Sequence, residues 1–312
     1  MTRVGGVAVV GSINADLTAY TSALPRPGET IIGEHFDLVL GGKGANQAVA
    51  AVRAGAATYL VAAVGNDLFR SLTLDLLTAE GIDTSAVQVL GGHTGIAHIR
   101  VDTTTGQNDI VVVPNANHQL TPEQAAAAVR SLRDRVAVVL VQLEIQLPVV
   151  IRVAEVCREL GLPLVLDPAP AQPLPDEIWP MVSVVKPNEL EAEVLTGIAV
   201  DDAITAEWAG RWFLERGAQA AVITMAERGV LVVDATAVRT YPAFQVQPVD
   251  TTAAGDAFAG VLGASLAQGL DLEEAVCRSL AAGALSVTVR GASPSLPSAT
   301  QIDDFLDSQS AG

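Results

Sequence analysis

Short runs of consecutive apolar residues alternate along most of the chain with segments whose apolar residues recur at helical spacing. Residues 4–11, 58–65 and 136–143 are such runs, and each predicts a buried strand. Residues 44–55, which lie between the first two runs, are rich in alanine and predict a helix. Buried strands separated by helices are typical of a parallel sheet with helices on both faces, so the pattern predicts an α/β fold.

The second half of the chain continues this alternation with clearer boundaries. Thr121, Pro122 and Gln124 have the order of an N-cap, a first helical residue and the closing residue of a capping box. Residues 148–160 predict a further helix, which Gly161 ends. Further strands are predicted within residues 163–170, 183–189 and 220–225. Ligands of such folds bind beyond the carboxyl ends of the strands, so polar residues that follow these strands are candidate site residues.

Two segments, residues 15–40 and 91–117, depart from this alternation. Both are rich in threonine, glycine and alternating strand residues, and the second reads as a hairpin around Thr103–Gln107. We expect these segments to form a small β-sheet that extends from an α/β body made of residues 1–14, 41–90 and 118–312.

Charge and length narrow the possible functions. The 312 residues carry a formal net charge of −17 and a pI near 4.5, which disfavours binding to nucleic acid or to anionic membranes. The longest apolar runs are too short to span a bilayer, and the first residues lack the pattern of a signal peptide. Cys157 and Cys277 are isolated in the sequence and suggest neither a metal site nor a disulfide framework. We therefore expect a cytoplasmic protein.

Lysine is rare in this chain. Of the 18 basic residues, 16 are arginines, and the two lysines are Lys43 and Lys186. Each lies in a turn marked by glycine or proline, "GGKGAN" and "VKPNE". A compact ammonium group differs from the planar guanidinium of arginine, so these two positions are candidates for a functional charge.

The stretch "VDTTAAGDAFAG", residues 249–260, places two aspartates among small residues. We expect Asp250 to end a strand and a helix to begin near Asp256. The small residues between them would let a ligand approach the backbone, and the amides of a helix N-terminus favour an anion. Asp256 could then remove a proton from an attacking hydroxyl, or it could simply cap the helix; this stretch alone leaves both readings open.

Common nucleotide and hydrolase motifs are missing from the sequence. It contains no GxGxxG, HExxH or GxSxG pattern, and "GGKGAN" lacks the first glycine and the Ser or Thr of a Walker A loop. Polar residues do follow the predicted strands, in "GSINADL", "VQLE" and "KPNELEAE". These residues would meet at one edge of the sheet.

Taken together and in order, these stretches resemble the PfkB family of carbohydrate kinases. "GGKGANQAVAA", "DPAPA", "KPNE" and "DTTAAGDAFAG" carry the resemblance, which covers nearly the whole chain, and "GSINAD" with "QLE" is similar to its ribokinase branch. The resemblance implies transfer of the ATP γ-phosphate to the 5-hydroxyl of D-ribose. The alternatives are another PfkB activity on 2-deoxyribose, fructose or a nucleoside, a catalytically silent sugar-binding relative, and a non-kinase binding protein.

The resemblance also implies site residues, position by position. The sugar would be held by Asn14, Asp16, Gly42, Lys43, Asn46, Glu144 and Asp256. Asp256 would be the catalytic base, and Ala253, Ala254, Gly255 and Asp256 would form an anion hole. ATP would lie along Asn188, Glu191, Thr224, Glu227, Gly229 and Gly255, with Asn188 and Glu191 serving its phosphates and Mg²⁺. A K⁺ loop would be formed by Asp250, Thr252, Ser286, Val289, Gly291 and Ser295.

Further expectations follow from the same resemblance. The segments 15–40 and 91–117 would form a lid over the sugar and pair two subunits as a homodimer. The sequence departs from the family at the nucleotide turn, where Met225, Ala226 and Glu227 interrupt Thr-Leu-Gly-x-x-Gly, and at Leu280, where a polar neighbour of adenine is common. His98 lies in a predicted lid strand, where a structural role is favoured over contact with the sugar.

Overall fold

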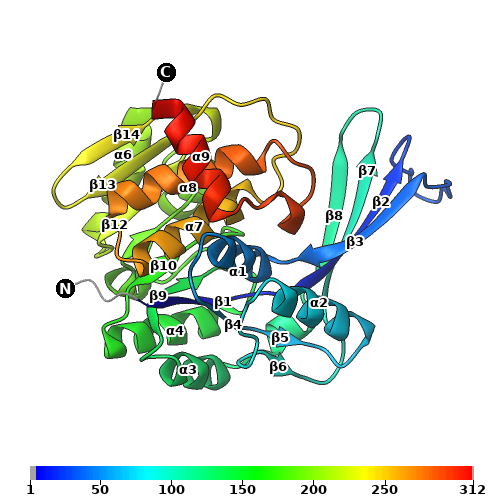
Figure 1. Cartoon of the computed structure of the whole chain (residues 1–312), viewed down its shortest axis with the longest axis horizontal. Helices are drawn as coiled ribbons and strands as arrows, with labels where there is room; N and C mark the ends of the chain where they lie inside the picture. Colours follow the sequence, from blue (N-terminus) through cyan, green and yellow to red (C-terminus); the bar gives the residue numbers. More distant parts are fainter. Residues whose placement is uncertain (1–4, 311–312) are drawn as a thin grey trace.

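The computed structural model describes residues 5–310 and shows a large sheet between two layers of helices, with a small sheet at one side (Figure 1). Within the described residues, the large sheet has eight strands in the order β14-β13-β12-β11-β10-β9-β1-β4. Its strands are β1 (Gly6–Val10), β4 (Thr58–Val61), β9 (Val136–Val141), β10 (Leu164–Leu166), β11 (Val184–Val185), β12 (Ala220–Thr224), β13 (Val230–Asp234) and β14 (Val238–Tyr241). All pairs from β4 to β12 are parallel, and β13 and β14 add an antiparallel edge.

Helices cover both faces of this sheet, as the apolar pattern predicts. The helices are α1 (Lys43–Arg53), α2 (Leu68–Ala79), α3 (Pro122–Ser131), α4 (Leu147–Leu160), α5 (Glu189–Thr196), α6 (Ala203–Glu215), α7 (Ala254–Ala267), α8 (Leu272–Ser286) and α9 (Ala299–Ser310). One core contains buried residues of α3, α4, α5 and α6, and the other contains residues of α1, α2, α7, α8 and α9. Their side chains are mostly Ala, Val, Leu and Ile, which matches the low aromatic content of 4%.

The parallel register places the polar strand ends in one row. Val10, Val141, Leu166 and Val185 are the last residues of four neighbouring strands, and they are aligned with one another. The residues that follow these strands therefore emerge side by side at one edge of the sheet. The strands are apolar and buried, and the first polar residues after them are the candidate site residues.

The second sheet has four strands in the order β3-β2-β7-β8. These are β2 (Asn14–Thr21), β3 (His35–Gly41), β7 (Gly95–Asp102) and β8 (Asn108–Val113). The hairpin around residues 103–107 is confirmed, because β7 and β8 pair antiparallel on either side of it. The sheet projects from the body beside α1 and α2 (Figure 1). A separate pair, β5 (Ala63–Val64) and β6 (Gln88–Val89), lies at the end of β4.

Local sequence signals explain several element boundaries. Thr121 caps α3 in the predicted capping box, in which its hydroxyl accepts from the Gln124 amide. Gly161 ends α4 in the left-handed conformation. In the described part of the chain, short 3₁₀ helices connect other elements: η1 (Asn115–Gln119), η2 (Asp176–Met181), η3 (Ala226–Arg228) and η4 (Ser293–Ser295). Within residues 5–310, no helix has the length and apolar content needed to cross a membrane.

Candidate active site

Asp256 lies in the first turn of α7, buried beneath the carboxyl edge of the sheet. Its helix begins at Ala254, two residues earlier than the sequence suggested, so Asp256 is inside the helix and is not its N-cap. The Asn46 side-chain amide donates to Asp256 Oδ2 at 3.0 Å, and that of Gln47 donates to Oδ1 at 3.0 Å. Both donors belong to α1, so two helices fix the direction of one carboxylate.

Helices α1 and α7 pack closely because small residues face each other between them. A Cβ atom added at Gly260 would lie only 2.5 Å from the Ala50 side chain and from the Gln47 carbonyl oxygen. A larger residue at this position would separate the helices and pull Asn46 and Gln47 away from Asp256. The small residues of "GANQAVAA" and "DAFAG" therefore set the geometry of the base.

The sugar-side residues are held by a second polar network. The Asn117 amide donates to Asn14 Oδ1 at 2.8 Å and to the Ile13 carbonyl at 3.1 Å, which fixes the orientation of Asn14. Glu144, which follows β9, accepts from the Ser12 hydroxyl at 2.5 Å and from the Lys43 amide at 2.9 Å. Residues from three separate elements are thereby joined at the edge of the sheet.

Four carboxylates, Asp16, Glu144, Asp167 and Asp256, act on one another and on Lys43 in this region. Burial, followed by the nearby charges of Glu144 and Asp256, raises the pKa of Asp16 to about 7. Burial also raises the pKa of Asp256, an effect that Lys43 opposes. Burial alone would lower the pKa of Lys43, but Asp256, Asp167 and Glu144 raise it above its ordinary value. Lys43 therefore stays charged among the carboxylates.

Successive residues along each strand of the small sheet lie on opposite faces of it. In the ladder of β2 and β7, Asp16 pairs with Ala97, whereas Leu17 pairs with His98. Paired residues of adjacent strands share a face and successive residues alternate, so His98 lies on the opposite face from Asp16. His98 is exposed there, which contradicts contact with the sugar pocket. Ala97 and its partner Val112 share the face of Asp16 instead.

The first turn of α7 has backbone amides available for an anion. Ala253 adopts a left-handed conformation, with φ 61°, and turns the chain into the helix. The Ala254 amide donates to the Thr251 carbonyl at 3.3 Å, so it is already engaged. The backbone N–H groups of Gly255 and Asp256 lie in the first turn of the helix, where no preceding helical carbonyl is available to accept from them. The prediction of an anion hole at residues 253–256 therefore rests mainly on these two N–H groups.

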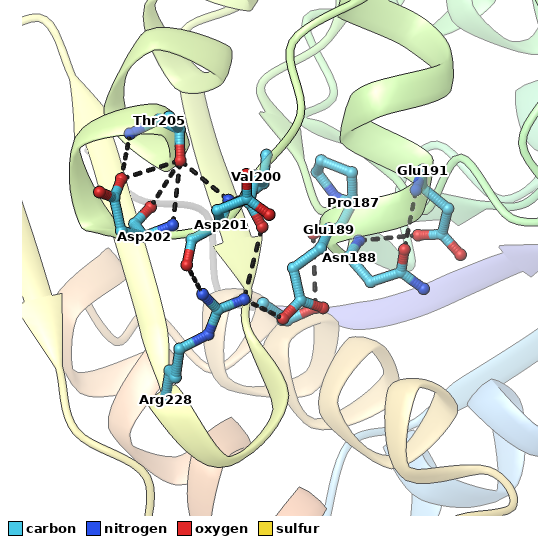
Figure 2. Close-up of polar contacts among 10 residues, drawn as sticks. Pro187, Asn188, Glu189, Glu191, Val200, Asp201, Asp202, Thr205 and Arg228 are labelled. Carbon is cyan, nitrogen blue, oxygen red and sulfur yellow. Dashed lines mark hydrogen bonds and ion pairs between the residues drawn. The ribbon is translucent and has the colours of Figure 1, made fainter.

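Asn188 and Glu191 form the cap of α5 (Figure 2). The Asn188 side chain accepts from the Glu191 amide at 2.8 Å, and the Glu191 carboxylate accepts from the Asn188 amide at 2.8 Å. The N-x-x-E spacing therefore serves as a capping box in addition to any contact with a ligand. Burial raises the pKa of Glu191, whereas Lys186 opposes that rise.

The turn of residues 225–229 is fastened to α5 by Arg228. The guanidinium donates to Glu189 Oε1 at 2.9 Å and also to the carbonyl oxygens of Val200 and Asp201 (Figure 2). On the other side of the turn, the Thr224 amide donates to the Pro187 carbonyl at 2.9 Å. Ala226 has a positive φ of 47°, so the turn is held in a conformation that alanine rarely adopts.

A cavity of about 600 Å³ is lined by Lys43, Gly255 and Asp256 together with Asn188, Glu191, Thr224, Glu227 and Gly229. Apolar side chains also line it, among them Phe244, Val246, Leu280 and Val287. Every residue predicted to bind the nucleotide therefore lines one cavity, which Asp256 lines as well.

The proposed cation loop is brought together from two segments. Asp250 accepts from the Thr252 amide at 2.9 Å and from the Gly291 amide at 2.9 Å, and its own amide donates to the Val287 carbonyl at 3.1 Å. The prediction that Asp250 ends a strand is wrong, because residues 242–250 form neither helix nor strand. The contact between Asp250 and the loop that follows α8 is nevertheless present.

Sequence reasoning missed several residues that support the site. Gln47 orients Asp256 and Asn117 orients Asn14, and neither Gln47 nor Asn117 was a predicted site residue. Gln142 follows β9 and donates to Gln47 Oε1 at 2.5 Å. The available signal was position: a buried polar residue at a strand end or next to a site residue needs a partner.

Comparisons with known proteins agree with this geometry. A family model described as pfkB family carbohydrate kinase matches residues 5–299. Ribokinase of Haemophilus influenzae is 37% identical over 96% of this chain and 97% of its own length, and deoxyribokinase of Salmonella typhi is 35% identical over 96% and 98%. A structure of Arabidopsis thaliana ribokinase complexed with ribose and ATP superposes with a TM-score of 0.89 at 28% identity, covering 97% of this chain and 99% of that one.

Proposed function

This chain belongs to the pfkB family of carbohydrate kinases, and from that premise we propose that it transfers the γ-phosphate of ATP to the 5-hydroxyl of D-ribose. The observation that carries the proposal is the position of Asp256. It lies in the first turn of α7, accepts from Asn46 and Gln47, and lines the same cavity as the residues predicted to bind the nucleotide.

In the proposed reaction, Asp256 accepts the proton of the 5-hydroxyl as that oxygen attacks the γ-phosphorus. The bond between the γ-phosphorus and the β–γ bridging oxygen breaks, and ADP leaves with the electron pair of that bond. Asn46 and Gln47 hold the carboxylate in position, and Lys43 supplies a compensating positive charge. The Gly255 and Asp256 amides would bind the oxygens of the transferred group. Phosphoryl transfer depends mainly on positioning and on neutralising charge, which such an arrangement provides.

We propose that the donor is ATP and that its adenine binds against the apolar part of the cavity lining. Phe244, Val246 and Leu280 belong to that lining, so Leu280 would pack against the flat face of the base in place of a polar contact. Since ATP is made and kept inside cells, the proposed donor also favours a cytoplasmic location.

The family implies two metal ions, Mg²⁺ and K⁺, and we propose residues that would hold each of them. Within residues 5–310, no group of three or more His, Cys, Asp and Glu side chains is arranged to hold a metal ion. Mg²⁺ commonly binds through one or two carboxylates together with substrate phosphates, and we propose Glu191, supported by Asn188, for that role. Magnesium would neutralise the phosphate charge. K⁺ would be held at the loop of Asp250, Thr252, Ser286, Val289, Gly291 and Ser295.

We also propose that residues 15–40 and 91–117 act as a lid and as a dimer contact. Their sheet leaves large apolar side chains exposed, including Phe36, Ile110 and Val111 at 55%, 52% and 57%. Exposed apolar surface of this kind on a projecting sheet favours a second subunit. Light scattering would show a dimer, and a Val111→Lys variant would shift the protein toward the monomer.

A coupled assay tests the proposed substrate. ATP turnover would be measured with D-ribose, 2-deoxyribose, fructose and adenosine, with and without K⁺. A site with several hydroxyl-binding groups discriminates strongly against a substrate that lacks a hydroxyl, so the specificity constant for ribose should exceed that for 2-deoxyribose. Equal or higher values for 2-deoxyribose would assign the chain to the deoxyribokinase relatives, and no turnover with any sugar would reject kinase activity.

A further inference from the structure

The second lysine of the chain, Lys186, lies in the same cavity as the proposed base but has no part in the reaction described above. It directly follows β11, and its neighbour across the sheet is Asp167, which directly follows β10. Both line the cavity, and their side chains are only 4% and 1% exposed. Lys186 Nζ lies 3.1 Å from Asp167 Oδ1, so they form a buried ion pair at the floor of the site.

The ion pair is joined to both parts of the catalytic machinery. On the side of Asp167, the Gln47 amide nitrogen lies 2.6 Å from Asp167 Oδ2 and 3.0 Å from Asp256 Oδ1, so one side chain bridges two carboxylates. On the other side, Lys186 Nζ lies 3.4 Å from the Gly255 carbonyl oxygen. A Cβ atom added at Gly255 would be 3.5 Å from Nζ, which places the ammonium group beside the first turn of α7.

An ammonium group has three N–H donors, and the contact with the Gly255 carbonyl uses one of them. Asp167 Oδ1 is close enough for an ion pair but accepts no hydrogen bond from the described residues. Taking both charges out of water is costly, and a buried ion pair is often no more stabilising than apolar residues of similar size. Its presence in the lining of the cavity, beside the first turn of α7 that carries the base, therefore points to a function for the charge.

We infer that Lys186 is a further catalytic residue, one of whose remaining N–H groups contacts the transferred phosphoryl group beside the Gly255 and Asp256 amides. Asp167 and Gln47 are positioning residues. Asp167 directs the ammonium group toward the first turn of α7, and Gln47, which donates to both carboxylates, fixes the position of the ion pair relative to Asp256. The inference rests on the proposed kinase function. It assigns to Lys186 the neutralisation of charge on the γ-phosphate.

The test compares nucleotides that differ in their phosphates. ATP and AMP affinities would be measured by calorimetry without sugar, so that no turnover is needed, for the wild type and for Lys186→Met. The ratio of ATP affinity to AMP affinity should be at least tenfold lower in the variant than in the wild type. The AMP affinity of the variant should stay within twofold of the wild-type value. With ribose present, kcat should fall by about 10²-fold, the typical effect of losing one donor to a developing charge, and the KM for ribose should stay within threefold.

A second variant guards against misfolding, because Lys186→Met leaves Asp167 buried without its partner. The double variant Lys186→Met/Asp167→Asn removes both charges and should show the same loss of ATP preference. Arg211→Met is a matched control that removes one positive charge from an exposed ion pair on α6; it should leave the preference unchanged.

An unchanged ratio of ATP to AMP affinity in the folded double variant would overturn the inference and reduce the ion pair to a structural element. A wild-type protein that binds ATP in preference to AMP but does not phosphorylate ribose would count against the proposed substrate alone.

Discussion

Replacing Asp16 by asparagine should stabilise the sugar-free protein, and the gain should depend on pH. Burial, then Glu144 and Asp256, raise the pKa of Asp16 from 3.8 to about 7. For a carboxyl group whose pKa is raised by folding, the stability contribution is fully present below about pH 4 and is lost as the pH rises through 7. Each pKa unit corresponds to about 1.4 kcal/mol, so ionisation of Asp16 costs the folded state about 4 kcal/mol above pH 7.

Urea unfolding of the wild type and Asp16→Asn at pH 5, 6, 7 and 8, at one protein concentration, would measure this cost. The difference in free energy of unfolding should grow by about 1.4 kcal/mol per pH unit up to pH 7 and level off above it. Asp75→Asn, an exposed carboxylate on α2, is the control. A difference that is the same at pH 5 and pH 8 would refute the electrostatic account of Asp16. Ribose should stabilise the wild type more than Asp16→Asn.

Three further predictions concern activity. Asp256→Asn should lower kcat by at least 10²-fold while ribose binding measured by calorimetry persists, and near-normal turnover would remove Asp256 as the base. Arg228→Met should raise the KM for ATP several-fold, because the nucleotide turn loses its contacts with Glu189 and with the carbonyls of Val200 and Asp201. The KM for ribose should stay unchanged. An unaltered KM for ATP would show that these contacts do not contribute to nucleotide binding. Replacing K⁺ by Na⁺ at constant ionic strength should lower kcat more than it changes the KM for ribose, and identical turnover in both salts would exclude a role for K⁺ at the Asp250 loop.

The sequence was most informative where one physical signal decided the structure. Short continuous apolar runs bounded by turn residues predicted buried strands, and the sheet they form is parallel from β4 to β12, as expected. The antiparallel strands β13 and β14 were not predicted, because their direction depends on a turn whose shape no short pattern specifies. Asp250 lies in irregular chain, where it binds two amides, because local hydrogen bonds of aspartate compete with strand pairing.

The sequence named candidate site residues but not the side chains that hold them in position. Asp256 stood out among small residues at a predicted helix start, and the resemblance to the carbohydrate kinases implied its role as the base. The donors that orient it come from α1, about two hundred residues earlier. Long-range pairs such as Asn14 with Asn117 leave no mark in the local pattern. The opposite orientation of His98 follows from strand register, which is set by pairing in three dimensions.

The two lysines of this chain also determine how the protein would react with amine-modifying reagents. Both line the cavity, and Lys186 is nearly inaccessible to solvent, while the raised pKa of Lys43 keeps its amine protonated and therefore a poor nucleophile. The outer surface draws its positive charge from arginine, which acylating reagents do not modify. An amine-directed dye or cross-linker should therefore leave the folded enzyme almost untouched beyond its terminal amino group, and it should yield a uniformly tagged product that keeps its activity.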